Sequence, residues 1–486
     1  MNTRLITTVL AALTVLAGCG GGGGSTSTPT TPVTPVTPVT PAPTVTLAIS
    51  QPKITLGSSA TLTWASTNAT SCTASGAWAG TQAISGTSAQ TPSAAGPGTY
   101  TLTCTGAGGT ANQSVSLIVP IPVQKSSYLN AKNTGMAPQA LPKSTGANPV
   151  KFIASTEQIT AGYAFGDFFQ DGSYSMVGFS NNFVPSSDPN YGRTPGHAYF
   201  YKKDANGNWV DHTSDLLTDQ TGCISPRKVI VADFNGDGVP DVFVACHGTD
   251  LYPLPPGYVA GEIPRILLSQ PNGTYKNVAA PIDCYCHGAT AADVNGNGFA
   301  DIVVVDTAIN KQPFYLVNNK DGTFKPEYTR MPPATAPNVT CNPACTRSIY
   351  SAEFIDFDKT GKFDLWLGGI EDRSLANFSS TIFHNPGANN FASATATVLP
   401  AATGAAAADT TTLDIVYING SIYVMRVNLA YTETSVQKID YKTLVSSTVY
   451  SNTSPYSNGS NWFEWMLPYQ TNIVSGNAVY AVSIPQ

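Results

Sequence analysis

Three nine-residue stretches of the chain follow one pattern: DFNGDGVPD at 233–241, DVNGNGFAD at 293–301 and DFDKTGKFD at 356–364. Each stretch has oxygen-bearing side chains at positions 1, 3, 5 and 9, and a glycine at position 6. A fainter fourth copy, DFFQDGSYS at 167–175, keeps carboxylates only at positions 1 and 5. Repetition of this kind predicts both a repetitive architecture and a bound ion.

The spacing of the oxygens suits a calcium ion, which binds about six to eight oxygen atoms. Glycine at position 6 permits the sharp turn because it adopts positive φ without strain. We therefore predict about three structural calcium sites, each completed by the carbonyl of position 7. The predicted ligands are Asp233, Asn235, Asp237, Val239 and Asp241; Asp293, Asn295, Asn297, Phe299 and Asp301; and Asp356, Asp358, Thr360, Lys362 and Asp364. The alternative is an Asp/Asn-Gly hairpin turn that holds no metal.

The residues around these loops predict strands rather than helices. KVIVADF at 228–234 precedes the first loop, DVFVACH at 241–247 follows it, and DIVVVD at 301–306 follows the second. Such β-branched runs have the length of strands. Each loop is therefore predicted to be the turn of a β-hairpin. An EF-hand loop differs, because it lies between helices and closes with Glu at position 12.

These hairpins resemble the FG-GAP repeats, also called VCBS repeats, of integrin α-chain-type β-propellers. GDF at 166–168 and ADF at 232–234 match the strand opening of that family. LVNNKDGTF at 316–324 and LLSQPNGTY at 267–275 match its third-strand ending. The resemblance is strongest over about 160–400. It implies a β-propeller, in which sheets pack around a central axis.

The motif spacing bounds the number of blades. The four motifs start 66, 60 and 63 residues apart, so residues 123–486 have room for six blades, or seven if the last ones are shorter. A single sheet cannot cover its own faces, so each must pack on its neighbours around the axis. We expect residues 123–160 to join the C-terminal strands and close the ring.

Residues 45–120 predict a separate small β-sandwich. ATLTWAS at 60–66 and GTYTLTC at 98–104 alternate in the manner of strands. The segment resembles a bacterial Ig-like domain, which implies a disulfide between Cys72 and Cys104. It departs from the antibody pattern, in which the tryptophan lies between the two cysteines. The predicted fold class is thus all-β: an Ig-like β-sandwich followed by a six- or seven-bladed β-propeller.

The N-terminal residues predict export. A positive residue and a short apolar run end in Leu-Ala-Gly-Cys at 16–19, and this run is too short to be a transmembrane helix. Residues 1–19 resemble the signal peptide and lipobox of a bacterial lipoprotein. The resemblance implies lipidation of Cys19 and an outer-membrane location, which we expect to be the cell surface. An ordinary cleaved signal peptide and a periplasmic orientation are the alternatives. Residues 20–44, rich in Gly, Thr and Pro, predict a linker that acts as a stalk.

The chain has nine cysteines, and eight remain once Cys19 is set aside. An even number in an oxidising compartment predicts disulfides. Cys341 and Cys345 are expected to pair with each other. The pairing of four others stays open: Cys223, Cys246, Cys284 and Cys286. A zinc site built from these cysteines and neighbouring histidines is the alternative.

Hairpin geometry places all the ion loops on one rim of the propeller. The opposite rim then carries two long loops, 181–197 and 247–263. Aromatic and charged side chains on exposed loops suit the recognition of a glycan or a protein. The alternative is that these loops simply pack onto the rim. The candidate ligand-binding residues are Tyr191, Arg193, Tyr252 and Tyr258.

The formal charge of −6 and the pI near 5.3 argue against a nucleic-acid partner. The chain contains neither G-x-S-x-G nor H-E-x-x-H. We therefore expect a monomeric, calcium-stabilised binding or adhesion module that touches the membrane only through its lipid anchor, and not an enzyme. The alternative is a secreted polysaccharide lyase or hydrolase, for which His247 and His287 are the candidate catalytic residues.

Overall fold

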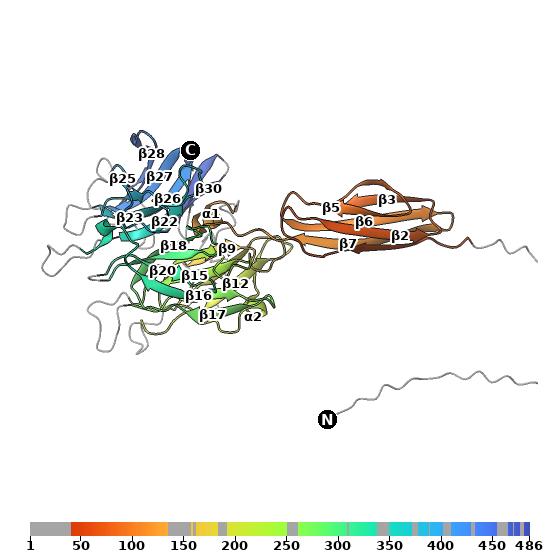
Figure 1. Ribbon diagram of the computed structural model, residues 1–486, viewed down its shortest axis with the longest axis horizontal. Coiled ribbons are helices and arrows are strands. Elements are labelled where there is room, and N and C mark those ends of the chain that lie inside the picture. The colour runs from red at the N-terminus through yellow and green to blue at the C-terminus, as the bar shows by residue number, and fades with distance from the viewer. Residues whose placement is uncertain are drawn as a thin grey trace, which may run out of the picture.

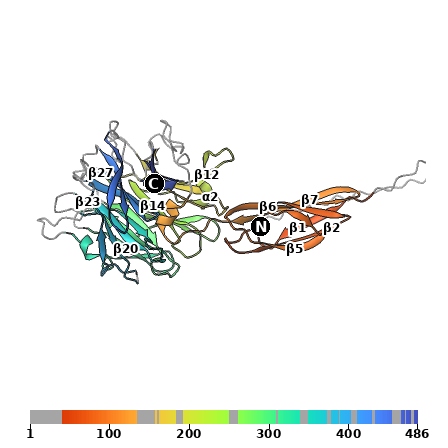
Figure 2. The same ribbon diagram turned by 90° about the horizontal axis from the view of Figure 1, so that it is seen from above.

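The computed structural model consists almost entirely of β-strands (Figure 1). It describes residues 40–134, 157–158, 162–182, 192–249, 261–308, 311–337, 349–371, 378–387, 389–401, 410–428, 433–453, 465–469, 471–476 and 481–486. In these ranges no helix is long and apolar enough to span a membrane. An elongated N-terminal unit extends from a larger body built of several sheets (Figures 1 and 2).

The N-terminal unit is formed by two antiparallel sheets. One contains β1 (Thr44–Ile49), β2 (Ala60–Thr67) and β5 (Ser85–Gln90). The other contains β4 (Gly80–Gln82), β3 (Ser71–Gly76), β6 (Gly96–Gly106) and β7 (Gly109–Val119). Alternate residues of β2 and β6 are buried, which is the pattern expected of strands with one face on a core. The resemblance of this N-terminal unit to Ig-like domains stays a prediction.

Cys72 and Cys104 form the expected disulfide. The two residues lie directly opposite each other on β3 and β6, with their Cα atoms 4.0 Å apart. The bond therefore joins neighbouring strands of one sheet, whereas the antibody disulfide joins the two sheets. Both cysteines are buried in the sandwich core beside Leu102 and Trp64.

The larger body consists of antiparallel sheets whose first strands lie side by side in chain order. In the described residues there are five four-stranded units and one three-stranded unit, which we call blades one to six. Blade one contains β9 (Tyr163–Gly166), β10 (Ser175–Phe179), β12 (Ala198–Lys203) and β13 (Trp209–Asp211). Blade two contains β14 (Pro226–Ala232), β15 (Asp241–Cys246), β16 (Arg265–Ser269) and β17 (Tyr275–Ala279). Blade three contains β18 (Cys286–Ala292), β19 (Asp301–Asp306), β20 (Phe314–Asn318) and β21 (Phe324–Glu327).

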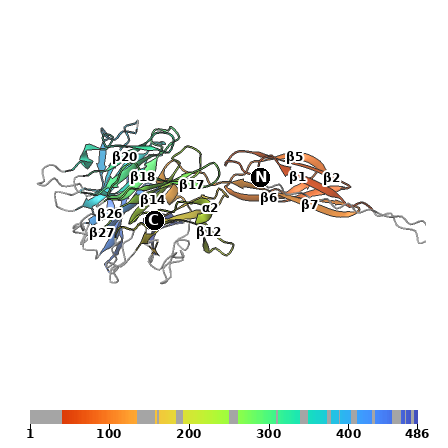
Figure 3. The ribbon, with the colours of Figure 1, turned by 90° about the horizontal axis from the view of Figure 1, so that it is seen from below.

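The remaining three blades follow the same meander. Blade four contains β22 (Ile349–Ile355), β23 (Asp364–Glu371), β24 (Thr381–Phe383) and β25 (Ala396–Val398). Blade five contains β26 (Thr410–Ile418), β27 (Ser421–Asn428), β28 (Thr434–Asp440) and β29 (Ser446–Asn452). Blade six contains β30 (Trp465–Tyr469), β31 (Asn472–Gly476) and β32 (Ala481–Pro485). A short pairing of β23 with β26 joins blades four and five. Figure 3 shows the blades from below. This arrangement is a β-propeller; the number of blades in the whole ring stays a prediction.

Inner strands are apolar on both faces because each face packs on a different neighbour. Every residue of β15 is buried. Val242 and Val244 pack into the core between blades one and two, while Phe243 and Ala245 pack into the core between blades two and three. Burial of each large apolar side chain stabilises the fold by about 1.5–3 kcal/mol. This packing explains the continuous β-branched runs that follow the loop motifs.

A short helix, α1 (Ser127–Lys132), lies at the axis among the inner strands (Figure 1). It contacts β9, β14, β18, β22 and β30, which belong to five different blades. The Ser126 side chain caps the helix by accepting a hydrogen bond from the Leu129 N–H. Of residues 123–160, which we expected to join the C-terminal strands, residues 127–132 form this helix, which contacts β30, while β8 (Glu157–Gln158) pairs with β11 (Asn181–Asn182). Within the described residues, the sheet of blade one and the sheet of blade six share no strand.

Candidate ion loops and the axial site

The three predicted loops share one backbone arrangement. In each, the carboxylate at position 1 accepts a hydrogen bond of 2.7–2.9 Å from the N–H of the glycine at position 6. All three glycines have positive φ, between 76° and 88°. Each loop joins the first and second strands of its blade, so the predicted hairpin turns are confirmed. The bonded pairs are Asp233 and Gly238, Asp293 and Gly298, and Asp356 and Gly361.

Hard oxygen atoms line the inside of these turns. In the first loop, Asn235 Oδ1 accepts from the Asp237 N–H and Asp237 Oδ1 accepts from the Val239 N–H, at 3.1 and 2.8 Å. The second loop repeats this pattern with Asn295 and Asn297. Oxygen atoms brought together by such a turn are the ligands that calcium prefers. The residues at positions 1, 3 and 5 are therefore of the type that calcium binds, and calcium binding at these loops stays a prediction.

The buried carboxylate at position 9 has a second role. Asp241, Asp301 and Asp364 each accept a backbone N–H from the end of the third strand, at 2.7–2.8 Å. Asp241 also accepts from Phe234 N at 2.7 Å. These bonds tie each hairpin to its third strand, a role that the spacing of the motif does not reveal. The three third-strand donors are Ser269, Asn318 and Asn385.

Burial makes these carboxylates costly to ionise. It raises the pKa of Asp241 to about 7 and that of Asp301 to about 6. Burial also raises the pKa of Asp233, and the nearby Asp237 carboxylate adds to the effect. A divalent cation in the loop would offset this cost, because an adjacent positive charge favours the ionised form.

The ion loops of blades two and three touch, so these two loops lie on one rim. The Ala300 N–H of blade three donates to the Asp233 carbonyl of blade two at 3.1 Å. The Phe299 ring packs so closely on Gly236 that a Cβ there would lie 2.7 Å from the ring. An Asn389 side chain of blade four donates to Asp301 of blade three. The loops therefore also hold adjacent blades together.

The fourth loop adopts the same frame with different side chains. Asp167 accepts from the N–H groups of Asp171 and Gly172, at 3.0 and 2.9 Å. The Lys202 ammonium forms an ion pair with the Asp171 carboxylate. Asp167 Oδ2 also accepts from the Ile121 N–H at 2.9 Å, which joins the loop to the segment that follows the sandwich.

Two disulfides lie on the rim opposite the ion loops. Cys223 is bonded to Cys246, and Cys284 is bonded to Cys286. Glu262 lies close enough to the first pair to form a potential metal cluster. Because both sulfurs of that pair are bonded to each other, neither offers a thiolate ligand for zinc. The expected Cys341–Cys345 pair lies outside the described residues, as does Cys19.

Equivalent β-bulges occur on this rim in blades two, three and four, and blade five has a further one at Leu413. Arg227, His287 and Tyr350 are each the second residue of the first strand in consecutive blades. Each is an extra residue that the pairing with the second strand skips. Bulges re-aim side chains and are frequent beside functional sites. Arg227 and its neighbour Lys228 both line one axial cavity.

The bulges gather aromatic rings near the axis. The ring centroids of His287 and Tyr350 lie 4.6 Å apart, and those of His247 and His287 lie 5.6 Å apart. Tyr285 stacks beside His247 at 3.6 Å and donates its hydroxyl to the Thr249 carbonyl. The two histidines predicted as catalytic candidates therefore meet in one cluster. We call His247, Tyr285, His287 and Tyr350 the axial site.

Only one of the four predicted ligand-binding residues lies in the part of the chain that the structure describes. Arg193 is exposed in a turn before β12. The other three, Tyr191, Tyr252 and Tyr258, lie outside the described residues. No sequence signal distinguishes the bulged positions, although Cys-His-Gly occurs both at 246–248 and at 286–288.

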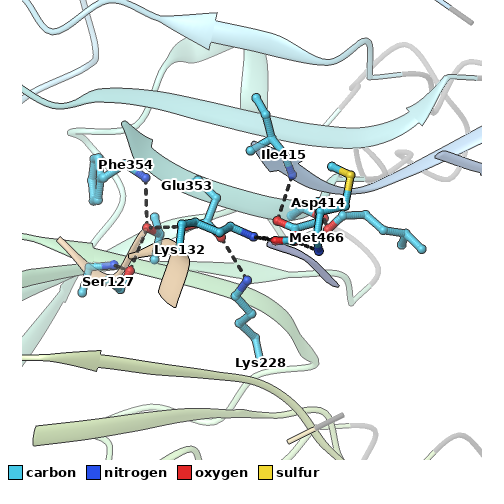
Figure 4. A network of polar contacts seen from close by, with 12 residues as sticks. Ser127, Lys132, Lys228, Glu353, Phe354, Asp414, Ile415 and Met466 are labelled. Carbon is cyan, nitrogen blue, oxygen red and sulfur yellow. Dashed lines mark hydrogen bonds and ion pairs between the residues drawn. The ribbon is translucent and has the colours of Figure 1, made fainter. Parts of the chain in front are cut away.

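A buried polar network joins α1 to the surrounding inner strands (Figure 4). Lys228 Nζ lies 2.9 Å from Glu353 Oε1, and the other Glu353 oxygen accepts from Thr290, whose hydroxyl contacts Ser127 of α1. Figure 4 also shows Lys132 reaching Asp414 and the Met466 carbonyl. A cavity of about 100 Å³ remains between these residues and the inner strands.

The pKa values of the two lysines in this network, Lys132 and Lys228, are shifted in opposite directions. Burial lowers the pKa of Lys132, and the Asp414 carboxylate offsets only part of that effect. Burial opposes the charge of Lys228 as well, but Glu353 and Asp414 outweigh it and raise the pKa of Lys228. Lys228 therefore keeps its positive charge beside Glu353 in this cavity.

Comparison with known proteins agrees with this fold. The model of the FG-GAP-like repeat matches residues 190–244 and 293–367. The chain thus contains FG-GAP-like repeats and folds as a β-propeller. No protein with a curated description matches the sequence significantly.

Several solved structures show a distant likeness. A quinoprotein alcohol dehydrogenase-like protein from Bacteroides thetaiotaomicron is 10% identical, with a TM-score of 0.27, over 83% of this chain and 94% of its own. Rhamnogalacturonan lyase YesW is 13% identical, with a TM-score of 0.31, over 90% of this chain and 89% of its own. The exotype rhamnogalacturonan lyase YesX is 11% identical, with a TM-score of 0.31, over 84% of this chain and 72% of its own. Values this low say nothing about the activity of this chain.

Proposed function

We propose that this protein is an exported, calcium-stabilised β-propeller that binds a carbohydrate outside the cell at the axial site. The observation that carries the proposal is the pair of equivalent bulges at His287 and Tyr350, which bring these two rings within 4.6 Å of each other from neighbouring blades. A repeated departure from regular pairing at one rim is typical of a functional position.

The chemistry of the axial site suits a sugar. The half-buried rings of His287 and Tyr350 meet edge to face and offer apolar ring faces, and their polar atoms offer hydrogen bonds. The inner strands hold these side chains on a rigid frame, and two disulfides brace the loops around them. A rigid site loses little conformational entropy when a ligand binds.

Calcium has a structural role in this proposal. The ion loops join the opposite ends of the same inner strands, so a bound ion would not touch a ligand at the axial site. Its effect would be to neutralise the carboxylates of each turn and so stabilise the contacts between blades. The expected content is three ions per chain.

Export as a lipoprotein belongs to the same proposal. Lipidation at Cys19 and the stalk at 20–44 would hold the two folded units away from the outer membrane. Labelled palmitate should be incorporated into the wild-type chain and not into Cys19→Ser. Equal labelling of the two would contradict the lipid anchor and leave the sugar site untouched.

A glycan array tests the ligand. We expect the wild-type propeller to bind at least one glycan and Tyr350→Ala to bind it at least tenfold more weakly. Tyr350→Phe, which keeps the ring, should retain most of the affinity. Trp209→Ala, on the outermost strand of blade one, is the matched aromatic control and should bind normally. Equal binding by Tyr350→Ala, or binding of only proteins, would contradict the proposal.

A polysaccharide lyase or hydrolase is the second candidate, because the rings of His247 and His287 lie together at the axial site. The bound glycan should be incubated with the protein and its reducing ends counted over time. Turnover that is lost in His287→Ala, with binding retained, would favour the enzyme. Binding without turnover would favour the recognition module.

A further inference from the structure

The fourth loop keeps the backbone frame of an ion loop. Asp167 accepts from the N–H groups four and five residues later, Asp171 and Gly172. Asp293 in the second loop makes the same two bonds, to Asn297 and Gly298, at 2.8 and 2.9 Å. The turn at 167–175 has therefore kept its shape although two of its side chains differ from those of the other loops.

One lysine contacts both of the altered loop's key positions. Lys202 Nζ pairs with the carboxylate of Asp171 at position 5. The same ammonium lies 5.4 Å from the ring centroid of Phe169 at position 3. An aromatic face and a carboxylate together stabilise one monovalent cation. Positions 3 and 5 supply oxygens for a divalent ion in the predicted calcium loops.

The place of Lys202 in the sheet strengthens this comparison. It follows Tyr201, which pairs with Met176, so it lies across from position 9 of its motif. The residues in the same register of blades two and three are Leu268 and Val317, which carry no charge. In blade four the same register holds His384, whose Nδ1 lies 3.3 Å from Asp364 Oδ2, so among these four blades a lysine occupies this position only beside the loop that lacks the full set of oxygens.

We propose that the Lys202 ammonium takes the place of the divalent cation in the fourth loop, so that residues 167–175 bind no calcium. The proposal rests on the calcium sites proposed for the other three loops. Burial opposes the charge of Asp171, but the hydrogen bonds and the charge of Lys202 outweigh it and lower the pKa of Asp171. The charge of Asp171 is therefore neutralised from within the chain.

This substitution has a consequence for the junction with the sandwich. Asp167 Oδ2 accepts from Ile121 N, which lies between β7 and α1. The loop that holds the sandwich is therefore independent of calcium, whereas the contacts between blades two, three and four depend on it. Chelation should weaken the propeller while the Asp167–Ile121 junction stays in place.

Calcium stoichiometry tests the proposal. Dialysed protein analysed by metal mass spectrometry should contain three calcium ions per wild-type chain and three per Asp171→Asn chain. The matched control, Asp293→Asn in the second loop, should contain two. Four ions in the wild type, falling to three in Asp171→Asn, would overturn the role of Lys202. Fewer than three in the wild type would instead contradict the calcium sites of the proposed function.

A rebuilt loop gives the complementary test. The triple variant Phe169→Asn, Ser175→Asp and Lys202→Leu restores the pattern of the calcium loops and should bind one ion more than the wild type. Lys202→Met alone should lower the melting temperature equally in chelator and in calcium, because it leaves Asp171 without its countercharge. If Lys202→Met had the stability of the wild type, the ammonium would have no such role.

Discussion

Lys132 Nζ lies 2.6 Å from Asp414 Oδ2, and this ion pair joins the axial helix to a strand 282 residues later in the chain. Both side chains are almost completely buried. Lys132 also donates to the Met466 carbonyl at 2.7 Å, and Asp414 accepts from the Met466 N–H at 2.7 Å. Blades five and six therefore meet the helix at one ion pair, which ties the end of the chain to the start of the ring.

Removal of the Lys132 charge should destabilise the whole propeller. Lys132→Met leaves the Asp414 carboxylate buried without its countercharge, which costs about 3–5 kcal/mol. We expect a correspondingly lower free energy of unfolding in urea denaturation. Lys276→Met, at an exposed position, is the control and should change it by less than about 0.5 kcal/mol. An equal stability of the two variants would show that α1 does not close the ring.

Position 9 of the motif should matter with or without calcium. Asp241→Ala removes the acceptor of the Ser269 and Phe234 N–H groups, and each unsatisfied buried group costs about 1–3 kcal/mol. The variant should therefore lose stability in chelator as well as in calcium. Asn235→Ala, in the same loop, should lose stability chiefly in calcium. Denaturation of both variants under both conditions checks this, and a purely calcium-dependent loss for Asp241→Ala would be inconsistent with it.

Calcium should raise the melting temperature of the wild type. A site filled at about one hundred times its dissociation constant stabilises the fold by about 2.7 kcal/mol. Differential scanning calorimetry in millimolar calcium and in chelator should resolve the shift, and Asp293→Asn should reduce its size. Magnesium at the same concentration serves as the control ion. Identical melting temperatures in calcium and in chelator would contradict structural sites.

Stability should also depend on pH through Glu262, on the rim opposite the ion loops. Burial raises the pKa of Glu262 to about 7, despite the N–H of Ile224 and the charge of Arg265, from 4.5 for the ordinary group. Between these values the folded chain binds more protons than the unfolded chain. The contribution of Glu262 to stability is therefore full below pH 4.5 and is lost as the pH rises through about 7.

Glu262→Gln, which cannot ionise, isolates this contribution. Its free energy of unfolding should fall less between pH 5 and pH 8 than that of the wild type. Urea denaturation at the two pH values measures the difference. A slope as steep in the variant as in the wild type would assign the pH dependence to other groups.

The turns and strands could be predicted well because each depends on residues that lie a few positions apart in the sequence. Oxygen-bearing side chains at alternate positions, with a glycine at position 6, form the same turn wherever they occur, and β-branched runs form strands on either side. The pairing of the cysteines could not be predicted from their spacing in the sequence. Cys223 pairs with Cys246 because blade two brings them to one rim, and no local pattern encodes that distance.

The axial helix and the bulges escaped prediction for a different reason. Residues 127–132 are too few to form a stable helix alone, and they form one here because five inner strands surround them. A bulge at Arg227, His287 or Tyr350 depends on how the first strand pairs with the second, not on the bulged residue itself.

The amino-acid sequence by itself determined an all-β chain with repeated hairpins and loops lined by oxygen atoms, because each of these features depends on residues a few positions apart. Only the tertiary structure decided which carboxylates face a third strand, which lysine neutralises the fourth loop, and which side chains meet at the axis. Those relationships join residues tens to hundreds of positions apart, and they exist only once the sheets have packed around one another.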